Sequence, residues 1–540
     1  GGEGLGRRGR VERGRRGAGP GPRAVGTGGT GVEGVDAWGQ VEGVGDRLMD
    51  GVARFGSMQI CLPAKDSHRS IDFHGKVPAE ATPDMWADLI EGEARDGFGF
   101  ILKGRVNDVG YGAITVPGSL KAYGEAHGEF GALPWRRVVA PAIAQAEEGF
   151  HVRPHMHRFW SDTTDMGRVP NPERTRATPA ARRLYCDDGG APLKPGTLIR
   201  NPDLAEILRC IAEGGANIFY TGDIAARIDA DMKAHGGLLT AADLAAYETK
   251  RSAPLWGEYR GFRVATNQPP GGGIMLVEML NILENFDLAA IGHNSPEYIR
   301  VVCETMKRAT IDKDAHVGDP AFAPIPPRLT DRAYAAEAAA AIKIGEVAHV
   351  ERLGSGGGAE SPHTTHISVV DGDGGAVAMT HSLGMPSGVV SDGMGFMYNG
   401  CMAVFDPRPG RTGSIAPGKS RFSSICPTML FKGDDPYLVI GAPGGTQIAM
   451  GVLQAILNVV DFGMAMDRAV AAPRFSATSD AIDISNRIPR YTAAALEARG
   501  YEVIRSYLGF TIAAVHGIKI EHGVLEGGAD PGHDGMALEV

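Results

Sequence analysis

One stretch, residues 363–380, constrains the fold of this chain more than any other. It predicts two β-strands, 364–370 and 376–380, joined by a turn at Asp371-Gly372-Asp373-Gly374. The segment in front of the first strand, residues 354–358, consists of glycine and serine, a composition typical of a flexible linker. The pattern therefore predicts a β-hairpin whose first strand begins at Thr364, directly after a flexible lead-in.

A threonine at the head of such a strand has two interpretations. If the His363–Thr364 bond is cut, Thr364 gains an α-amine beside its own hydroxyl. The pKa of an α-amine is about 7.7–8.0, so it can take the hydroxyl proton near neutral pH. Alternatively, Thr364 and Thr365 are ordinary β-branched strand residues. On this stretch alone the ordinary interpretation is favoured.

Composition excludes several classes of function. The 540 residues are 43% hydrophobic and 22% charged, which is typical of a soluble globular protein. The net charge of −10, without a basic stripe beyond the N-terminus, gives no reason to expect a nucleic-acid partner. No apolar run approaches the roughly 18 residues of a membrane span, so no membrane partner is expected. The six cysteines contain no Cys-x-x-Cys pair, and we expect neither a metal nor another cofactor.

Residues 1–50 differ from the rest of the chain. About a third of them are glycine, with arginines interspersed and little aliphatic periodicity. They are either a disordered tail or GC-rich DNA read out of frame, and the sequence leaves both open. They contain no apolar core of a secretory signal, so a cytoplasmic location is expected. Ordered structure is expected to begin near Met58.

Further along, helices dominate residues 80–250, including one expected over 82–99. Paired strands are expected over 255–266, and later helices over 274–286, 295–315, 446–461 and 491–499. Strands fill the chain between the linker and about residue 442, and a hairpin ends it. Strands flanking a block of helices predict an α+β fold, a layered αββα architecture and not a βαβ repeat.

Three loops could meet at Thr364. Ser382 lies on the returning strand, where its hydroxyl could orient a nucleophile; otherwise it is a plain strand serine. Ser423-Ser424 could donate hydrogen bonds to a substrate carboxylate or carbonyl, or serve only as turn residues. Gly444-Gly445 precedes helix 446–461, and its amides could hold an oxyanion, or form only a tight turn.

A fourth motif predicts a different function. Residues 413–420 fit the phosphate-loop pattern Gly-x-x-x-x-Gly-Lys-Ser, which requires a buried strand before it and a helix after it. Pro407-Arg408-Pro409-Gly410 precedes it and Ile425-Cys426-Pro427 follows shortly after, so neither condition is expected to be met. Nucleotide binding therefore remains only a weak alternative.

Taken together, these segments resemble the γ-glutamyltransferase family of N-terminal nucleophile hydrolases. The similarity runs from about residue 57 to the C-terminus. It is carried above all by Thr364-Thr365-His366, Ser423-Ser424 and Pro443-Gly444-Gly445, and also by Asp72-Phe73, Val116-Pro117-Gly118 and Ala472-Pro473-Arg474-Phe475. The resemblance implies an αββα four-layer sandwich. It also implies a zymogen that cuts itself between His363 and Thr364 into a large subunit, 57–363 after an atypical 1–56, and a small subunit, 364–540.

The resemblance assigns roles residue by residue. Thr364 matches the nucleophile, and Ser382 stands where the family has a threonine that orients it. Ser423 and Ser424 match the serines that bind the substrate carboxylate. Gly444-Gly445 matches the oxyanion hole. The catalytic groups are therefore expected to be kept.

Four positions depart from the family. His74 replaces the arginine that grips the γ-glutamyl carboxylate, and Gly384 replaces an asparagine. Cys401 and Val404 replace the glutamine and aspartate that hold the α-amino group. An ammonium buried without a partner is costly, so the glutamyl pocket is expected to be lost, unless a carboxylate such as Asp392 or Asp406 substitutes. Residues 405–419 resemble the acylase-like branch of the family.

The sequence thus leads to an amide-bond hydrolase or acyltransferase with a threonine nucleophile that disfavours glutathione. The expected partners are a small-molecule amide and the chain's own cleaved subunit; self-association into a homo-oligomer stays open. One rival is a relic that keeps the scaffold but does not mature, motivated by residues 1–50. The phosphate-loop module is the weaker rival.

Overall fold

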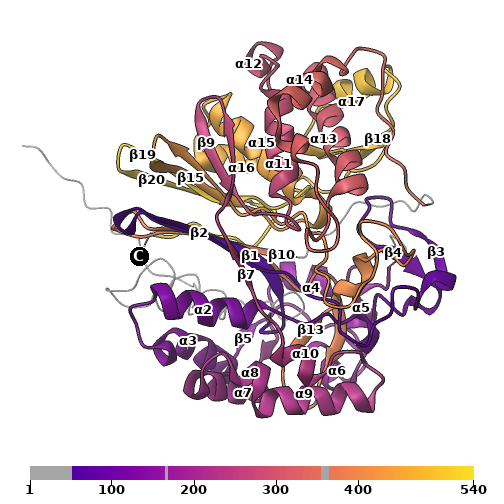
Figure 1. Cartoon of the computed structure of the whole chain (residues 1–540), viewed down its shortest axis with the longest axis vertical. Coiled ribbons are helices and arrows are strands. Elements are labelled where there is room, and N and C mark those ends of the chain that lie inside the picture. Colours follow the sequence, from indigo (N-terminus) through magenta and orange to yellow (C-terminus); the bar gives the residue numbers. More distant parts are fainter. Residues whose placement is uncertain (1–50, 164–167, 354–363, 540) are drawn as a thin grey trace, which may run out of the picture.

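Two stacked β-sheets form the centre of the molecule (Figure 1). The computed structural model describes residues 51–163, 168–353 and 364–539. The five-stranded sheet has the order β10 (Thr364–Val370), β11 (Ala376–Ser382), β1 (Phe55–Leu62), β2 (Ser67–Phe73), β7 (Lys250–Ser252). The six-stranded sheet has the order β20 (Val524–Ala529), β19 (His516–Glu521), β15 (Asp435–Gly441), β14 (Thr428–Lys432), β9 (Phe262–Thr266), β8 (Leu255–Tyr259).

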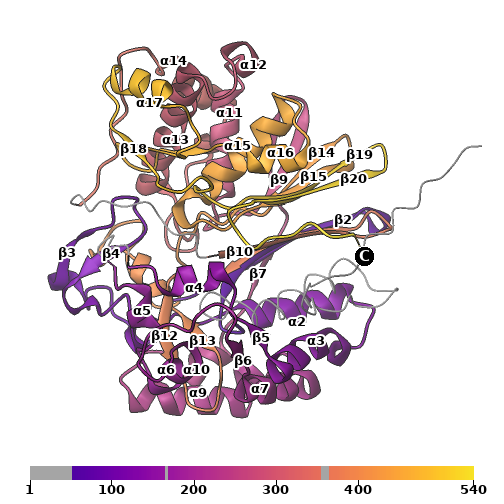
Figure 2. The same cartoon turned by 180° about the vertical axis from the view of Figure 1, so that it is seen from behind.

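Helices cover the outer face of each sheet, as both views show (Figures 1 and 2). The layer on the five-stranded sheet contains α2 (Ser119–Phe130), α3 (Trp135–Glu148), α7 (Pro202–Gly214), α8 (Ile218–Thr221), α9 (Asp223–Ala234) and α10 (Ala241–Ala245). The layer on the six-stranded sheet contains α11 (Gly273–Leu283), α12 (Leu288–Ile291), α13 (Pro296–His316), α14 (Arg332–Ala340), α15 (Ile448–Val460), α16 (Met466–Ala471) and α17 (Arg490–Glu497). The predicted αββα sandwich is therefore confirmed.

Shorter elements surround this body. They are the helices α4 (Pro154–Trp160), α5 (Asn171–Arg174) and α6 (Pro179–Tyr185), the strand pairs β3 (Ile90–Glu93) with β4 (Phe100–Leu102), β5 (Phe150–His151) with β6 (Leu198–Ile199) and β12 (Pro386–Val390) with β13 (Met397–Asn399), and the small sheet of β16 (Phe475–Ser476), β17 (Ile482–Ile484) and β18 (Val503–Arg505).

The faces of the five-stranded sheet differ because strand side chains alternate. Met58 and Ile60 of β1 belong to the apolar core beneath α2, α3 and α7. The other face meets the six-stranded sheet, and there β1, β11 and β10 are in register at Phe55, Ser382 and Thr364. Since directly opposite residues share a face, these three side chains form one row between the sheets.

Local capping explains where several helices start. The Asn201 side chain accepts from the Leu204 amide at the start of α7. Thr240 and Asp243 form a capping box at the start of α10. In the described ranges, no helix combines the length and apolar composition that a bilayer crossing requires.

Two expectations about local structure were wrong. The helix expected over 82–99 is absent: turns lead into a short 3-10 helix at Ala87–Leu89 and then β3 and β4. Gly97 and Gly99 have φ of 73° and 111°, which turns the chain back on itself. Ordered structure also begins before Met58, because β1 starts at Phe55 and Val52–Arg54 are already buried. Residues 1–50 lie outside the described residues.

Candidate active site

Thr364 and Ser382 lie side by side at the end of the central sheet. The Thr364 hydroxyl donates to Ser382 Oγ over 3.2 Å, and Ser382 Oγ also accepts from the Gly384 amide over 2.8 Å. Both side chains are buried. The structure therefore brings together, within hydrogen-bond distance, the two hydroxyl groups that the sequence singled out.

A polar row continues along the same face, and the sequence analysis did not assign it a role. His366 Nδ1 lies 2.8 Å from Thr380 Oγ1, and its Nε2 lies 2.9 Å from Ser368 Oγ. Burial lowers the pKa of His366 well below its usual value, so the ring is neutral. The signal in the sequence was the recurrence of polar side chains at 364, 366 and 368, every second position of a strand whose other residues are Thr365, Ile367, Val369 and Val370.

This row connects β10 to the six-stranded sheet. Ser368 Oγ donates to the Val439 carbonyl over 3.2 Å. Two residues earlier, the His366 ring occupies the space beside Gly441, where a Cβ would lie 2.3 Å from the ring. Moving two residues back along β10, from Ser368 to His366, thus corresponds to moving two residues forward along β15, from Val439 to Gly441. One further step brings the Thr364 end of β10 to the loop Pro443-Gly444-Gly445.

That loop turns sharply before α15. Gly444 has φ 145° and Gly445 has φ 53°, and a Cβ on Gly444 would lie 2.6 Å from Ala513 Cα. Only glycine fits there without a backbone shift. The described part of the chain offers no hydrogen-bond acceptor to either glycine amide. Both N–H groups remain available to an anion.

Ser423-Ser424 lies in the loop that leads into β14. Ser423 pairs with Gly271, and its amide donates to the Pro270 carbonyl over 3.0 Å. Both serines are buried, and Ser423 Oγ accepts from the Ile425 amide over 3.1 Å. The Ser423 hydroxyl therefore keeps its proton for another acceptor.

The departures from the family pattern lie in the same region. His74 follows β2, and its Nδ1 donates to Asp72 Oδ2 over 2.6 Å. Cys401 is fully buried at the start of a 3-10 turn, Cys401–Val404, and burial raises the pKa of its thiol. These positions carry no negative charge for an ammonium group.

The two carboxylates that could have replaced it are engaged elsewhere. Asp392 is exposed and pairs with Arg183. Asp406 pairs with Arg408 over 2.6 Å.

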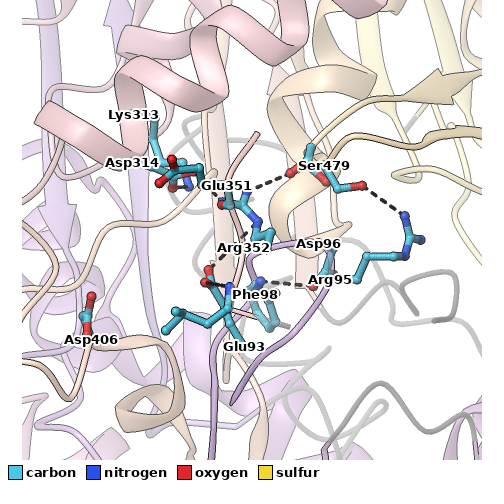
Figure 3. A network of polar contacts seen from close by, with 12 residues as sticks. Glu93, Arg95, Asp96, Phe98, Lys313, Asp314, Glu351, Arg352, Asp406 and Ser479 are labelled. Atoms are coloured by element: carbon cyan, nitrogen blue, oxygen red, sulfur yellow. Dashed lines mark hydrogen bonds and ion pairs between the residues drawn. The ribbon is translucent and has the colours of Figure 1, made fainter. Parts of the chain in front are cut away.

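The turn between β3 and β4 lies in a network of polar contacts with distant segments (Figure 3). Arg95 binds Asp483 over 2.8 Å. Arg352 binds Asp314 over 2.6 Å. The Glu93 amide donates to the Leu353 carbonyl over 2.7 Å. These contacts hold the turn between β3 and β4, which carries Phe98, in place.

The phosphate-loop motif does not have the required structure. Lys419 is buried, and its ammonium donates to the carbonyls of Thr412 and Ser414 over 2.7 and 2.9 Å. The Ser420 amide donates to Asp319, and residues 421–427 form no helix. A phosphate loop needs a free lysine at a strand-to-helix turn, so the nucleotide-binding alternative was wrong.

We expect Lys419→Ala to leave ATP–magnesium binding unchanged, because the Lys419 ammonium is bound to backbone carbonyls and forms no phosphate site in the described structure. Equilibrium binding of ATP with magnesium to both proteins checks this. Micromolar affinity in the unaltered protein that disappears in Lys419→Ala would contradict it. Among the described residues there is also no cluster of three or more metal-binding side chains.

The fold and these contacts define a class: an αββα sandwich with a hydroxyl group held at the head of β10, an edge strand of the five-stranded sheet, and two glycine amides without a described acceptor in the loop before α15. The sequence model of the gamma-glutamyltranspeptidase family matches residues 27–540. The chain therefore belongs to the gamma-glutamyltranspeptidase family, an enzyme family of amide-bond hydrolases and acyltransferases. The match begins well upstream of residue 57, where the resemblance becomes readable in the sequence.

Relatives include both acylases and glutathione hydrolases. The chain is 37% identical over 470 residues to the acylase ACY 1 proenzyme of Pseudomonas sp. strain V22, covering 86% of this chain and 81% of that protein. It is 34% identical over 483 residues to the glutathione hydrolase proenzyme of Escherichia coli K12, covering 86% and 80%. Among solved structures, the cephalosporin acylase from Bacillus halodurans aligns with a TM-score of 0.81 at 27% identity, covering 94% of this chain and 91% of that one.

Proposed function

We propose that the chain is an N-terminal threonine amide hydrolase or acyltransferase that matures by cleavage between His363 and Thr364. Cleavage yields a large subunit ending at residue 363 and a small subunit, 364–540, that remain one body. The observation that carries the proposal is the hydrogen bond from the Thr364 hydroxyl to Ser382, at the first residue of the edge strand β10. The relatives named as proenzymes support the maturation step.

In the proposed reaction, Thr364 Oγ attacks the carbonyl carbon of the substrate amide while the Thr364 α-amine takes the hydroxyl proton. The amides of Gly444 and Gly445 hold the oxyanion of the tetrahedral intermediate. When the C–N bond breaks, the protonated α-amine returns the proton to the leaving nitrogen. Water or an acceptor amine then attacks the acyl-threonine ester, releasing the acid or a new amide and restoring Thr364.

Denaturing electrophoresis with intact-mass analysis tests the proposal. We expect two fragments, the smaller beginning at Thr364, and release of amine from an amide substrate. A purified, folded protein that stays a single chain would contradict the proposal and favour the relic interpretation. The family model matches from residue 27 onwards, so it includes part of the stretch whose composition is atypical.

Ser382 offers a test of how the nucleophile is positioned. We expect Ser382→Ala to slow both cleavage and turnover by roughly 10- to 100-fold, because the Thr364 oxygen loses its hydrogen-bond acceptor. Ser382→Thr should restore both rates, since it keeps the hydroxyl. Single-turnover kinetics and the cleavage time course provide the measurements. A loss of thermal stability in Ser382→Ala without a change in either rate would show that the serine is only structural.

A further inference from the structure

A groove of about 620 Å³ lies beside α17, at the margin of the molecule in both views (Figures 1 and 2). The helix contributes Arg490, Ala493, Ala494 and Glu497 to the groove, and residues 486 and 505–507 complete the lining. Positions separated by three, four and seven residues lie on one face of a helix. The groove therefore exposes a single stripe of α17, with an arginine and a glutamate at its ends and two alanines between them.

The two charges at the ends of the stripe have no described partner. Within residues 51–163, 168–353 and 364–539, neither Arg490 nor Glu497 forms an ion pair; the pair near the end of α17 joins Arg499 to Glu297 instead. Arg505, the other arginine of the groove, donates to two backbone carbonyls over 2.8 and 2.9 Å. Seven residues of helix separate Arg490 from Glu497 by about 10 Å along the axis. Both charges therefore remain available to a group outside this chain.

The stripe is complementary to a copy of itself. A second α17 that lies antiparallel to the first, related to it by a two-fold axis between Ala493 and Ala494, meets it residue for residue. Arg490 then faces Glu497 of the partner subunit, and the same contact occurs a second time by symmetry. The alanines face each other, and their small side chains let the two helices approach closely. A stripe with charges of the same sign at both ends would instead repel its copy.

The strand beside this helix has an open edge. The small sheet has the order β16-β17-β18, so β18 has a neighbour on one side only. The Ser506 amide donates to the Ile484 carbonyl of β17, and the Glu502 carbonyl accepts from β17, so alternate residues from 502 to 506 face β17. Val503 and Arg505 direct their backbone groups the other way, where they have no hydrogen-bond partner in the described part of the chain. Such an edge can pair with another strand.

The open edge and the stripe fit the same symmetry. Because β17 and β18 are parallel, α17, which joins them, runs antiparallel to β18. When two β18 strands pair antiparallel about Ile504, Val503 exchanges backbone hydrogen bonds with Arg505 of the partner subunit, and the two α17 helices lie antiparallel on the joined sheet. Tyr491 and Tyr507 project from the same patch and are 74% and 78% exposed. Tyrosine is enriched in the centres of protein interfaces, so these rings add anchors.

We propose that two copies of this chain associate through the α17–β18 surface, with the β18 strands paired edge to edge and the α17 helices side by side. A peptide or an unrelated protein fits less well, because it would have to supply the open strand and both charges in this order. The surface is small, so the dimer has a Kd of about 1–10 µM. The inference goes beyond the proposed function and does not depend on it.

Sedimentation velocity of the full chain, from about 0.1 to 100 µM, measures the association. We expect Glu497→Arg and Arg490→Glu each to raise the Kd at least about tenfold, because each places like charges opposite one another. The double variant Arg490→Glu/Glu497→Arg exchanges the two charges and should restore the wild-type Kd, which a variant damaged in folding would not do. Glu337→Arg, the same charge change at an exposed position of α14, is the matched control and should leave the Kd unchanged.

A cysteine tests the strand register. The two copies of Ile504 lie opposite each other in a non-hydrogen-bonded pair, where Cβ atoms are about 4.5–5.5 Å apart, so Ile504→Cys should form a disulfide-linked dimer under mild oxidation. Leu525→Cys, at a position of β20 that is 51% exposed, should not link at the same concentration. A wild-type protein that stays monomeric at 100 µM, or that binds only a different protein through this surface, would overturn the inference. A dimer that Glu497→Arg does not weaken, or that the double variant does not restore, would overturn it as well.

Discussion

Thr364→Ala is expected to remain a single 540-residue chain and to lose at least about 10⁴-fold in amide turnover. The substitution removes the only oxygen that the proposal uses as nucleophile, both for cutting the His363–Thr364 bond and for attacking substrate. The side chain is small and buried, and its described hydroxyl contact is the single bond to Ser382, so the fold should survive. Intact mass measures chain cleavage, circular dichroism measures folding, and p-nitroanilide release measures amide turnover.

Two matched variants sharpen this result. Thr365→Ala removes a neighbouring hydroxyl from the opposite face of β10 and should mature normally, because strand side chains alternate. Thr364→Ser keeps an oxygen at the same place and should mature slowly but measurably. Normal cleavage of Thr364→Ala would show that the break lies elsewhere or is made by another protease, and would remove the basis for Thr364 as nucleophile.

The second large effect concerns specificity: γ-glutamyl-p-nitroanilide and glutathione are expected to be poor substrates. Cys401 and Val404 offer no charge to an α-ammonium, and Asp392 and Asp406 are paired with arginines. An ammonium left unpaired in a closed pocket costs on the order of 3–5 kcal/mol, about two to four decades in kcat/KM. The comparison is γ-glutamyl- against glutaryl-p-nitroanilide, which differ only in the α-amino group. Comparable rates for the two would refute the argument.

Restoring a charge should partly reverse this preference. Val404→Asp is expected to raise kcat/KM for γ-glutamyl-p-nitroanilide about tenfold, and Val404→Asn, which has the same shape without the charge, should not. Adding Cys401→Gln completes the family pattern, but Cys401 is fully buried beside Arg421, so the longer side chain needs space there. We therefore expect the double variant to gain more activity only if stability is maintained, which a thermal melt determines.

Regular elements with local signals could be predicted from the sequence. The structure has the helix near 202–214, which follows the capping residue Asn201, the helix near 135–148, which follows Pro134, and the strands around 255–266. The prediction of a helix over 82–99 was wrong because the residues at its expected N-terminus favour a turn as well as the start of a helix. Contacts of Glu93 and Arg95 with distant segments then stabilise the strand pair instead.

By itself, the sequence determined the layered fold and the hairpin that begins at Thr364, because turn residues and strand alternation are local signals. The register that places Thr364 opposite Ser382 comes from the structure. The surroundings of Arg421 depend on tertiary structure. Its neighbours Phe55, Phe98, Gly384 and Cys401 come from four separate parts of the chain, and only sheet stacking brings them together. A positive charge that lies on an ordinary loop in the sequence becomes a buried cation in the fold, and its Nη1 has no partner among the described residues. Burial and partners are properties of packing and not of local pattern.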